Sequence, residues 1–540
     1  MNVFIIAVLA LVPQVQSYRI TDRTLPAEGY RIRIGADGKA DVSAADDAGR
    51  FYARKTLKQL PKDAKDLEIE DWPAFRWRGI HLDESRHFFG AAAVKKLIAT
   101  MADHKLNVLH WHLVDDSGWR IDVPGYPEVA KTGATRGSRK GRHWLRDLED
   151  GTYGPYFYTT EELKGVIAFA KENFVTIVPE IEIPGHASQL LSKCYPQFAC
   201  DPKKPGGVFC LGNDEGLGFL DAAVDYVADL FPGEFVHIGG DEVNRKVWST
   251  CAKCKARAKE LGLKDTDALQ NWVTRRYAGR LAKKGKRIIG WDEILDGGEL
   301  PEDAAVMSWR GTEGGLKAVA AGREAVMCPH WNCYFDYTQC VKDDPVPYPC
   351  FVPPVPVSKV YEFDPLAGIP AEKRRFVIGG QCCNWTEWTC TPAELEWKIW
   401  PRACAIAEVF WTAPAKRDYD EFAARLAAHR PRLLAVDVNA APIAPRDGVY
   451  LEPRPRKVKL TLGTLDVHTN VVTEALCKFT EDKSIAPGGY AMEIHFERKV
   501  TIRHSDAAGK ARAMSALKDL ARPDGRKLKD LSFSCMEIED

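Results

Sequence analysis

The strongest constraint on the fold is a pattern that repeats along residues 72–442, in which an apolar strand, a loop and a helix follow one another. Apolar strand segments are expected at residues 79–82, 107–114, 175–183, 235–238, 287–290, 304–308, 324–328 and 376–379. Amphipathic helices lie between many of them, for example at residues 160–172, 217–230 and 267–284. Eight strands that alternate with helices predict an α/β fold, the parallel (β/α)8 TIM barrel.

Polar and aromatic residues gather at the positions that directly follow these strands. In a (β/α)8 barrel the active site is built at the carboxyl ends of the strands. Core packing alone would not require such residues there. The positions hold Asp83-x-x-Arg86, Asp115-Asp116, Glu182-x-x-x-His186, Asp241-Glu242, Trp291-Asp292-Glu293, Trp309-Arg310, residues 331–336 and Trp385-Thr386-Glu387. We therefore expect one functional site at this end of the barrel.

The stretch from residue 235 to residue 243 is central to that site. A short apolar strand, Phe-Val-His-Ile, ends at two glycines, and Asp241 and Glu242 follow at once. Adjacent carboxylates at the end of a barrel strand favour general acid and base chemistry. The alternative is a solvated acidic loop, because adjacent acidic residues also occur elsewhere, for example at Asp46 and Asp47.

Length and charge limit the architecture and the ligand. A chain of 540 residues is too long for one hydrophobic core. We expect a small α+β domain at residues 18–71, the barrel at residues 72–442 and a further α+β domain at residues 443–540. The 75 basic residues equal the 75 acidic residues in number. The charge balance therefore indicates neither nucleic acid nor an anionic membrane as a partner, and the expected ligand is neutral.

Residues 1–17 have the pattern of a signal peptide. The segment is apolar from Val3 to Val12, and the small residues Val15 and Ser17 suit cleavage near Ser17. This apolar run is too short to span a bilayer, and no later stretch is long enough. We therefore expect a secreted or periplasmic protein without a membrane span. The oligomeric state cannot be read from the sequence.

The cysteines fit an oxidising compartment but leave their pairing open. There are 15 of them, an odd number, so at least one is unpaired within the chain. The spacing Cys251-x-x-Cys254 occurs in zinc sites, but no second pair or histidine follows at the spacing of a zinc finger. A local disulfide or free thiols are therefore favoured over zinc. We predict no metal and no cofactor.

The end of the chain repeats its beginning. Residues 29–60 align without a gap on residues 489–520, and eleven of the 32 aligned pairs are identical. Apolar positions agree as well, since Ile34 aligns with Ile494 and Val42 with Ile502. We therefore predict that residues 443–540 form a second copy of the N-terminal α+β domain. Coincidence between two similar strand and helix patterns is the alternative.

Five motifs occupy the strand ends in chain order. They are Asp83-x-x-Arg86-His87-Phe88, His110-x-His112-x-x-Asp115-Asp116, Glu180-x-Glu182-x-x-x-His186, His237-x-x-x-Asp241-Glu242 and Gly290-Trp291-Asp292-Glu293. With these motifs, roughly residues 20–440 resemble the β-N-acetylhexosaminidases of glycoside hydrolase family 20. The small N-terminal unit looks like the α+β domain that precedes the barrel in that family.

The resemblance implies a role for each residue of the catalytic group. Glu242 would be the general acid that protonates the leaving oxygen, and later the base that activates water. Asp241 would accept the N–H of the sugar's 2-acetamido group, whose oxygen would attack C1 in place of a protein nucleophile. His186 and Asp115 would form a relay behind the acid. We expect Glu242 to be partly buried beside Asp241.

The resemblance also implies how the sugar is held. The residues that would enclose the acetamide methyl group and stack on the sugar ring are Trp291, Trp309 and Trp385. The acetamide oxygen would accept a hydrogen bond from Tyr334. The residues that would hold the sugar hydroxyls are Arg86, Asp336 and Glu387.

Some positions depart from the family pattern. Glu182 stands where an aspartate is commoner, and Cys382 and Cys383 stand where small residues are usual. We expect neither change to contact the residues assigned to chemistry. His110 and His112 lie two residues apart on one strand and face the same side, as metal ligands would. In this family-like context we favour core packing for both.

The resulting hypothesis is a secreted exo-acting β-N-acetylhexosaminidase. It would release terminal non-reducing N-acetylglucosamine or N-acetylgalactosamine from an oligosaccharide or glycoconjugate, with retention and by substrate-assisted catalysis. One alternative is a non-catalytic glycan-binding protein, which would have no need of Glu242, His186 and Asp115 together. Another is a disaccharide-releasing or endo-type relative, which an open cleft would favour over a closed pocket.

Overall fold

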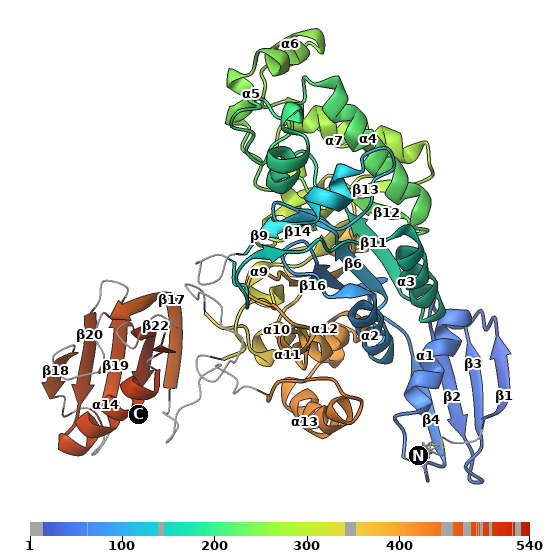
Figure 1. Ribbon diagram of the computed structural model, residues 1–540. Helices are drawn as coiled ribbons and strands as arrows, with labels where there is room; N and C mark the ends of the chain where they lie inside the picture. The colour runs from blue at the N-terminus through green and yellow to red at the C-terminus, as the bar shows by residue number, and fades with distance from the viewer. Residues whose placement is uncertain are drawn as a thin grey trace, which may run out of the picture.

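The computed structural model has three units along the chain: a small N-terminal sheet with a helix, a barrel, and a C-terminal sheet with a helix (Figure 1). The residues that the structure describes are 15–61, 63–138, 145–340, 353–443, 457–467, 477–481, 483, 485, 490–495, 499–520, 522–523 and 531–539. Residues 1–14 of the predicted signal peptide lie outside this set, and β1 (Val15–Ile20) begins within the remainder of it.

The centre of the chain forms a closed barrel of eight strands, all paired in parallel. Each strand overlaps one of the predicted apolar segments, which confirms the (β/α)8 fold. The strands are β5 (Trp77–Asp83), β6 (Val108–His112), β11 (Thr176–Glu180), β12 (Phe235–His237), β13 (Arg287–Trp291), β14 (Ala305–Ser308), β15 (Ala325–Met327) and β16 (Val377–Asn384). Every residue of β5 and β16 is buried, as expected for parallel strands that helices cover.

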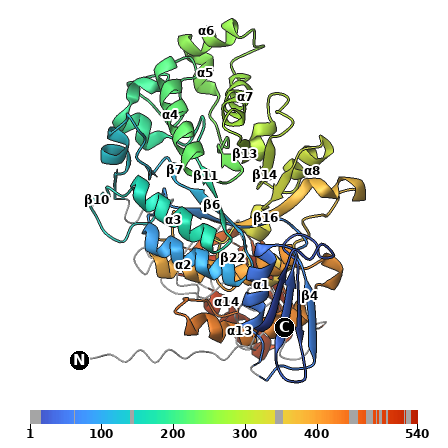
Figure 2. The same ribbon diagram turned by 90° about the vertical axis from the view of Figure 1, so that its right-hand side faces the viewer.

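Helices follow the strands and cover the barrel (Figures 1 and 2). The longer ones are α2 (Gly90–Asp103), α3 (Thr160–Glu172), α4 (Asp214–Leu230), α7 (Leu269–Ala282), α8 (Glu313–Ala320), α11 (Pro392–Ile399), α12 (Arg402–Trp411) and α13 (Tyr419–Ala435). The bounds of α3 equal the predicted ones, because Thr159 and Glu162 cap its first turn reciprocally. The helix α6 (Ala252–Glu260) is also one of the longer ones, and the shorter helices are α5 (Lys246–Thr250), α9 (His330–Cys333) and α10 (Val357–Tyr361).

The N-terminal unit is a four-stranded sheet with one helix. Its strands lie in the order β1, β3 (Ala40–Ala44), β2 (Tyr30–Ile34) and β4 (Leu67–Asp71), and α1 (Asp47–Leu57) connects β3 to β4. Every second residue of β2 is buried, so one face of the sheet packs into the core of the unit.

The N-terminal unit packs against the barrel through aromatic and charged contacts. Tyr52 of α1 meets Trp411 at the end of α12 edge to face, with ring centroids 5.3 Å apart. The fully buried Arg78 of β5 pairs with Glu28 at 2.6 Å. Its guanidinium also lies 5.1 Å from the centre of the Trp411 ring. These contacts connect the unit to the first strand of the barrel.

Four strands of the C-terminal unit lie in the same order as those of the N-terminal unit, and two further strands are added. Its sheet runs β18 (Cys477–Glu481), β20 (Lys499–His504), β19 (Tyr490–His495), β22 (Leu531–Glu539), and β17 (Lys457–Val467) lies beyond β22. The helix α14 (Ala507–Leu520) follows β20, and the short β21 (Arg522–Pro523) pairs with β22. Both β1 with β3 and β18 with β20 pair in parallel.

The two units also agree in register and in the start of their helices. Opposite residues in the central antiparallel pair are Ile32 and Val42 in one unit, and Met492 and Ile502 in the other. Each helix begins after an aspartate whose carboxylate accepts a hydrogen bond from a glycine N–H three residues later. This agreement supports the predicted duplication, which stays a prediction.

Within the part of the chain that the structure describes, no helix combines the length and apolarity needed to cross a membrane. In the part of the chain that the structure describes, twelve cysteines are not joined in disulfides. The local disulfide that was one reading of Cys251 and Cys254 is therefore not formed here.

Candidate active site

Two glycines shape the turn that carries the central carboxylates. Gly239 and Gly240 follow β12 with φ angles of 65° and 93°, which L-residues with a side chain rarely adopt. A Cβ atom on Gly239 would lie 1.9 Å from Oε2 of Glu182, so the space is filled as well. The turn places Asp241 in a buried position and Glu242 at the surface of the site.

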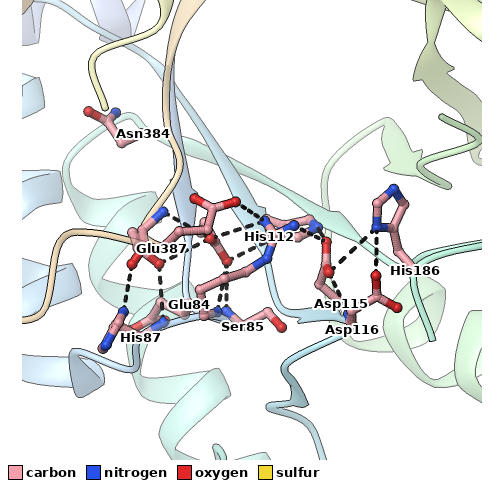
Figure 3. Close-up of polar contacts among 12 residues, drawn as sticks. Glu84, Ser85, His87, His112, Asp115, Asp116, His186, Asn384 and Glu387 are labelled. Atoms are coloured by element: carbon pink, nitrogen blue, oxygen red, sulfur yellow. Dashed lines mark hydrogen bonds and ion pairs between the residues drawn. The ribbon is translucent and has the colours of Figure 1, made fainter. Parts of the chain in front are cut away.

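His186 lies between two pairs of carboxylates at the carboxyl ends of the strands. Its Nε2 atom is 3.5 Å from Asp241 and 3.7 Å from Glu242. Its Nδ1 atom is 3.6 Å from Asp115 and 3.3 Å from Asp116, the side shown in Figure 3. The predicted grouping of Asp241, Glu242, His186 and Asp115 is therefore present. These distances are those of ion pairs rather than of short hydrogen bonds.

The charges in this group act on one another. Burial raises the pKa of Asp241 to about 6, although the nearby His186 lowers it. Burial lowers the pKa of the His186 imidazole, but Asp115 and Asp241 outweigh this and raise that pKa well above its ordinary value. The carboxylates on both sides of the ring therefore favour the charged form of His186.

Arg86 forms a second cationic centre next to this one. Its guanidinium lies 3.0 Å from Asp115, 3.2 Å from Asp83 and 3.5 Å from Glu387. Burial disfavours its charge, but these carboxylates, Asp115 first, raise the pKa of Arg86 well above its usual value. The guanidinium also stands 5.1 Å from the centre of the Trp385 ring. Asp115 therefore links Arg86 to His186.

The four predicted aromatic residues form a connected wall. Trp291 and Trp385 have ring centroids 5.8 Å apart, Tyr334 is 6.2 Å from Trp385, and Trp309 stacks on Tyr334 at 6.1 Å. Trp291 is held by a hydrogen bond of 2.8 Å from its indole N–H to Glu180. Aromatic rings provide apolar surface on which sugar rings pack. Trp309 and Trp385 are half-buried, whereas Trp291 is almost fully buried.

Asp336 and Glu387 complete the polar rim that the motifs predict. Burial, and then repulsion by Glu387, raise the pKa of Asp336 well above its usual value. The buried Oδ1 atom of Asp336 accepts no hydrogen bond within the described structure. Burial also raises the pKa of Glu387, against the opposing effect of Arg86. Unpaired buried carboxyl oxygens of this kind are suited to hydroxyl groups of a ligand.

Comparison with family models decides the class to which this site belongs. The model described as "Glycosyl hydrolase family 20, catalytic domain" matches residues 75–414, and "Glycosyl hydrolase family 20, domain 2" matches residues 9–72. The chain belongs to glycosyl hydrolase family 20. The first match covers the whole barrel from before β5 to the end of α12, and the second covers the N-terminal sheet.

Known family 20 proteins resemble this chain in sequence. The β-hexosaminidase of Porphyromonas gingivalis is 38% identical over 432 residues, which cover 75% of this chain and 54% of the relative. The β-hexosaminidase of Akkermansia muciniphila is 31% identical, with 76% of this chain and 85% of the relative covered. The chain thus spans about half the length of the first of these relatives.

Solved family 20 structures resemble the fold. The exo-β-N-acetylglucosaminidase of Vibrio harveyi, solved in complex with N-acetylglucosamine, superimposes with a TM-score of 0.72 at 33% sequence identity. The match covers 79% of this chain and 69% of the other. A β-N-acetylhexosaminidase of Bacteroides fragilis gives a TM-score of 0.69 at 30% identity, covering 79% of this chain and 86% of that one.

Two acidic residues of the family 20 site were not assigned from the sequence. Asp116 is nearer to His186 than Asp115 is, and it accepts a hydrogen bond from the Ser188 N–H at 2.8 Å. Glu293 accepts a hydrogen bond of 3.0 Å from the Trp309 indole, and burial raises its pKa to about 8. Both lie in the motifs given above, Asp116 next to the assigned Asp115 and Glu293 two residues after the assigned Trp291, and this closeness in sequence was the available signal.

A network of buried histidines and glutamates lies beneath the site. Glu180 pairs with His110 at 3.0 Å and with His237 at 2.8 Å, and all three side chains are fully buried. His112 lies 3.0 Å from Glu182 and 3.2 Å from Asp83. Core packing therefore describes His110 and His112 incompletely, because both hold carboxylates inside the barrel.

The structure corrects one expectation from the sequence. Glu242 is exposed rather than partly buried, since 62% of its side chain is accessible to solvent, and its φ of 49° is left-handed. Glu182 was expected not to contact the residues assigned to chemistry; it pairs with His112, and burial and then repulsion by Asp241 raise its pKa well above its usual value. Cys383 forms a backbone bridge with Tyr334, which was assigned to substrate binding and not to chemistry.

Proposed function

We propose that this family 20 chain is an exo-acting β-N-acetylhexosaminidase. It removes terminal non-reducing N-acetylglucosamine or N-acetylgalactosamine from oligosaccharides or glycoconjugates, with retention of the anomeric configuration. The single observation that carries this proposal is the group around His186, which stands within 3.7 Å of both Asp241 and Glu242 beside the aromatic wall. A protein that only bound glycans would not need this arrangement.

The proposed mechanism divides the work between two adjacent carboxylates. Family 20 is among the glycosidase families that use assistance from the substrate, so the acetamide oxygen attacks C1 and the protein supplies no nucleophile. Asp241 accepts the acetamide N–H and stabilises the positive charge that develops on that group. Glu242 protonates the leaving oxygen and then removes a proton from the incoming water. Its exposed side chain is open to the departing sugar and to water.

His186 and Arg86 support these steps through charge. The imidazolium of His186 lowers the pKa of Asp241, which favours the ionised form that the acetamide requires. Arg86 offers a rigid set of N–H donors to sugar hydroxyls, with Asp336 and Glu387 as acceptors. Trp291, Trp309 and Trp385 exclude water around the acetamide methyl group, and Tyr334 donates a hydrogen bond to its oxygen.

The relatives support the proposed substrate class. The predicted signal peptide supports secretion. Proteins named β-hexosaminidase resemble the chain over three quarters of its length, and a similar structure was solved in complex with N-acetylglucosamine. We also propose that residues 1–17 direct export, since this apolar segment has the length and the small residues of a signal peptide.

The test compares two chromogenic substrates that differ only in the acetamide. Purified enzyme is assayed with the nitrophenyl β-N-acetylglucosaminide and with the plain nitrophenyl β-glucoside. Cleavage of the first alone is expected, because the glucoside lacks the group that attacks C1. Cleavage of both would overturn the mechanism by implying a protein nucleophile. Cleavage of neither, with tight binding of N-acetylglucosamine, would indicate a glycan-binding protein.

A further inference from the structure

Four cysteines from two distant parts of the sequence meet in the loops above the active-site end of the barrel. Cys200 and Cys210 lie in the segment between β11 and α4, whereas Cys251 and Cys254 lie where α5 passes into α6. Their four sulfur atoms all lie within 4.8 Å of one another. Figures 1 and 2 both place α5 and α6 at the end of the molecule away from the N-terminal and C-terminal sheets.

The distances between the sulfurs have the size of a metal site. The separations are 3.7 Å between Cys200 and Cys254, 3.6 Å between Cys210 and Cys251, and 3.6 Å between Cys210 and Cys254. With Zn–S bonds of about 2.3 Å, the edge of a regular tetrahedron of four sulfurs is about 3.8 Å. A disulfide would require an S–S distance of about 2.05 Å. Cys210 has two equally near neighbours, which a set of paired disulfides does not predict.

The backbone around the cluster holds the four residues together. The segment from Cys200 to Cys210 is closed by an antiparallel bridge between Ala199 and Phe209 and by a hydrogen bond of 2.8 Å from the Cys210 N–H to Phe198. The Trp248 indole donates to the Phe209 carbonyl at 3.0 Å, which joins this segment to α5. These contacts hold the two cysteine-bearing segments together.

Gly212 allows the two segments to approach each other closely. A Cβ atom at this position would lie 2.2 Å from the Lys253 carbonyl carbon and 2.6 Å from the Cys254 nitrogen. Any larger residue would push the segment that carries Cys210 away from Cys251 and Cys254. Cys210, Cys251 and Cys254 are buried and Cys200 is half-buried, so the cluster is screened from water.

We propose that Cys200, Cys210, Cys251 and Cys254 bind one Zn²⁺ ion in a tetrahedral thiolate site. Four protein ligands leave no open position, so the ion would be structural rather than catalytic. Zinc binds the thiolate form, so binding releases the protons of the ligating thiols. This proposal replaces the preference for disulfide or free thiols that Cys251-x-x-Cys254 suggested by itself. It is independent of the proposed function, because the site is separate from the carboxylates around His186.

The proposed ion would fasten together the two loops that carry catalytic groups. His186 lies in the segment that leads from β11 to Cys200, and Asp241 and Glu242 lie in the segment that leads from β12 to Cys251. A bond network between these segments restricts how far His186 can move from the two carboxylates. We therefore expect the metal to affect catalysis only indirectly, by keeping His186 close to Asp241 and Glu242.

The first experiment measures metal and thiols in the unmodified protein. The full chain, purified without chelator, is analysed by inductively coupled plasma mass spectrometry, and its thiols are alkylated after denaturation and mapped by peptide mass spectrometry. We expect one zinc per chain and four alkylated thiols at these positions. Disulfides among them, iron in place of zinc, or no bound metal would each overturn the proposal. This measurement requires no variant that might fail to fold.

The second experiment tests the ligands by substitution and by cobalt. Protein produced with Co²⁺ should show the thiolate charge-transfer bands and the intense visible bands of a tetrahedral cobalt site. C210S and C254S should each reduce the zinc content at least tenfold. The control C194S alters a cysteine of the same segment that lies outside the cluster, and it should keep one zinc per chain. Retention of zinc in both cluster variants would place the ion elsewhere and refute the assignment.

Discussion

At the scale of single residues, the site is a set of interdependent charges. His186 has a carboxylate pair on each side, and Asp115 lies near both His186 and Arg86. Six charged groups within a few ångströms cannot titrate independently. The ionisation of Asp241, which the proposed chemistry requires, therefore depends on the imidazolium beside it.

The first prediction concerns the pH profile of H186Q. Burial raises the pKa of Asp241 to about 6, and the His186 charge is the main influence that lowers it. Removal of that charge should raise the pKa of Asp241 further. The acidic limb of kcat/KM should therefore move to higher pH, and the limb should stay in place in H429Q, a control in the distant α13. A shift of the limb to lower pH would contradict this account.

The second prediction concerns E242Q and the leaving group of the substrate. A glycoside with a poor leaving group needs protonation by Glu242, so its kcat/KM should fall by about 10²–10⁴-fold. A nitrophenyl glycoside needs less help from the acid in the bond-breaking step and should lose less. The control E161Q alters an exposed glutamate at the start of α3 and should leave both substrates unchanged. Equal losses for both substrates would argue against Glu242 as the general acid.

At the scale of secondary-structure elements, the barrel strands were predictable and several contacts were not. Buried parallel strands are continuous apolar runs, so segments such as 376–379 are visible in the sequence. The residues after the strands meet because all carboxyl ends face one edge of the barrel. The pairing of Glu180 with His110 and His237 inside the barrel could not be predicted, because it depends on the register between strands that are far apart in sequence.

The cysteine cluster also could not be predicted, because it joins residues that are far apart in sequence. Cys251 and Cys254 have the spacing of metal ligands, but Cys200 and Cys210 precede them by an entire helix and strand. Their nine-residue separation resembles no common zinc motif. Only the path of the two loops brings the pairs together, and that path follows from the barrel and not from local sequence.

The third prediction tests the turn after β12 with a matched pair of variants. Gly239 and Gly125 have φ angles of 65° and 84°, but a Cβ atom would contact the Glu182 carboxylate only at Gly239. G125A should cost about 1–2 kcal/mol of unfolding free energy, the usual penalty of a left-handed residue. G239A should cost clearly more and should also lower activity, as urea unfolding and kinetic assays would show. Equal losses of stability would show that the contact is relieved without strain.

At the scale of the whole molecule, two small sheets with the same strand order stand at the two ends of the chain. The N-terminal one is attached to the barrel by contacts around Trp411, including the buried pair of Arg78 with Glu28. The proposed C-terminal copy has no acidic and aromatic cluster like that of the barrel. We infer that it acts as a structural or interaction module and takes no part in the chemistry.

The fourth prediction is the result of deleting residues 451–540. The remaining chain keeps the N-terminal unit, the complete barrel and α13, so its active site should be intact. We expect kcat and KM to stay within about twofold of the full chain, whereas the melting temperature should decrease. Circular dichroism confirms folding. Loss of activity in a truncated chain that is fully folded would assign the C-terminal unit a catalytic role.

The helix α1 makes two of the aromatic contacts that join the first sheet to the barrel, with Phe51 tilted against Phe174 and Tyr52 against Trp411. The aligned positions in the last part of the chain are Ala511 and Arg512. A chain with two similar sheets and one receiving surface would otherwise be at risk of domain exchange during folding. Because neither aromatic ring is present at the aligned positions, we expect the C-terminal sheet to bind that surface less well than the N-terminal sheet does.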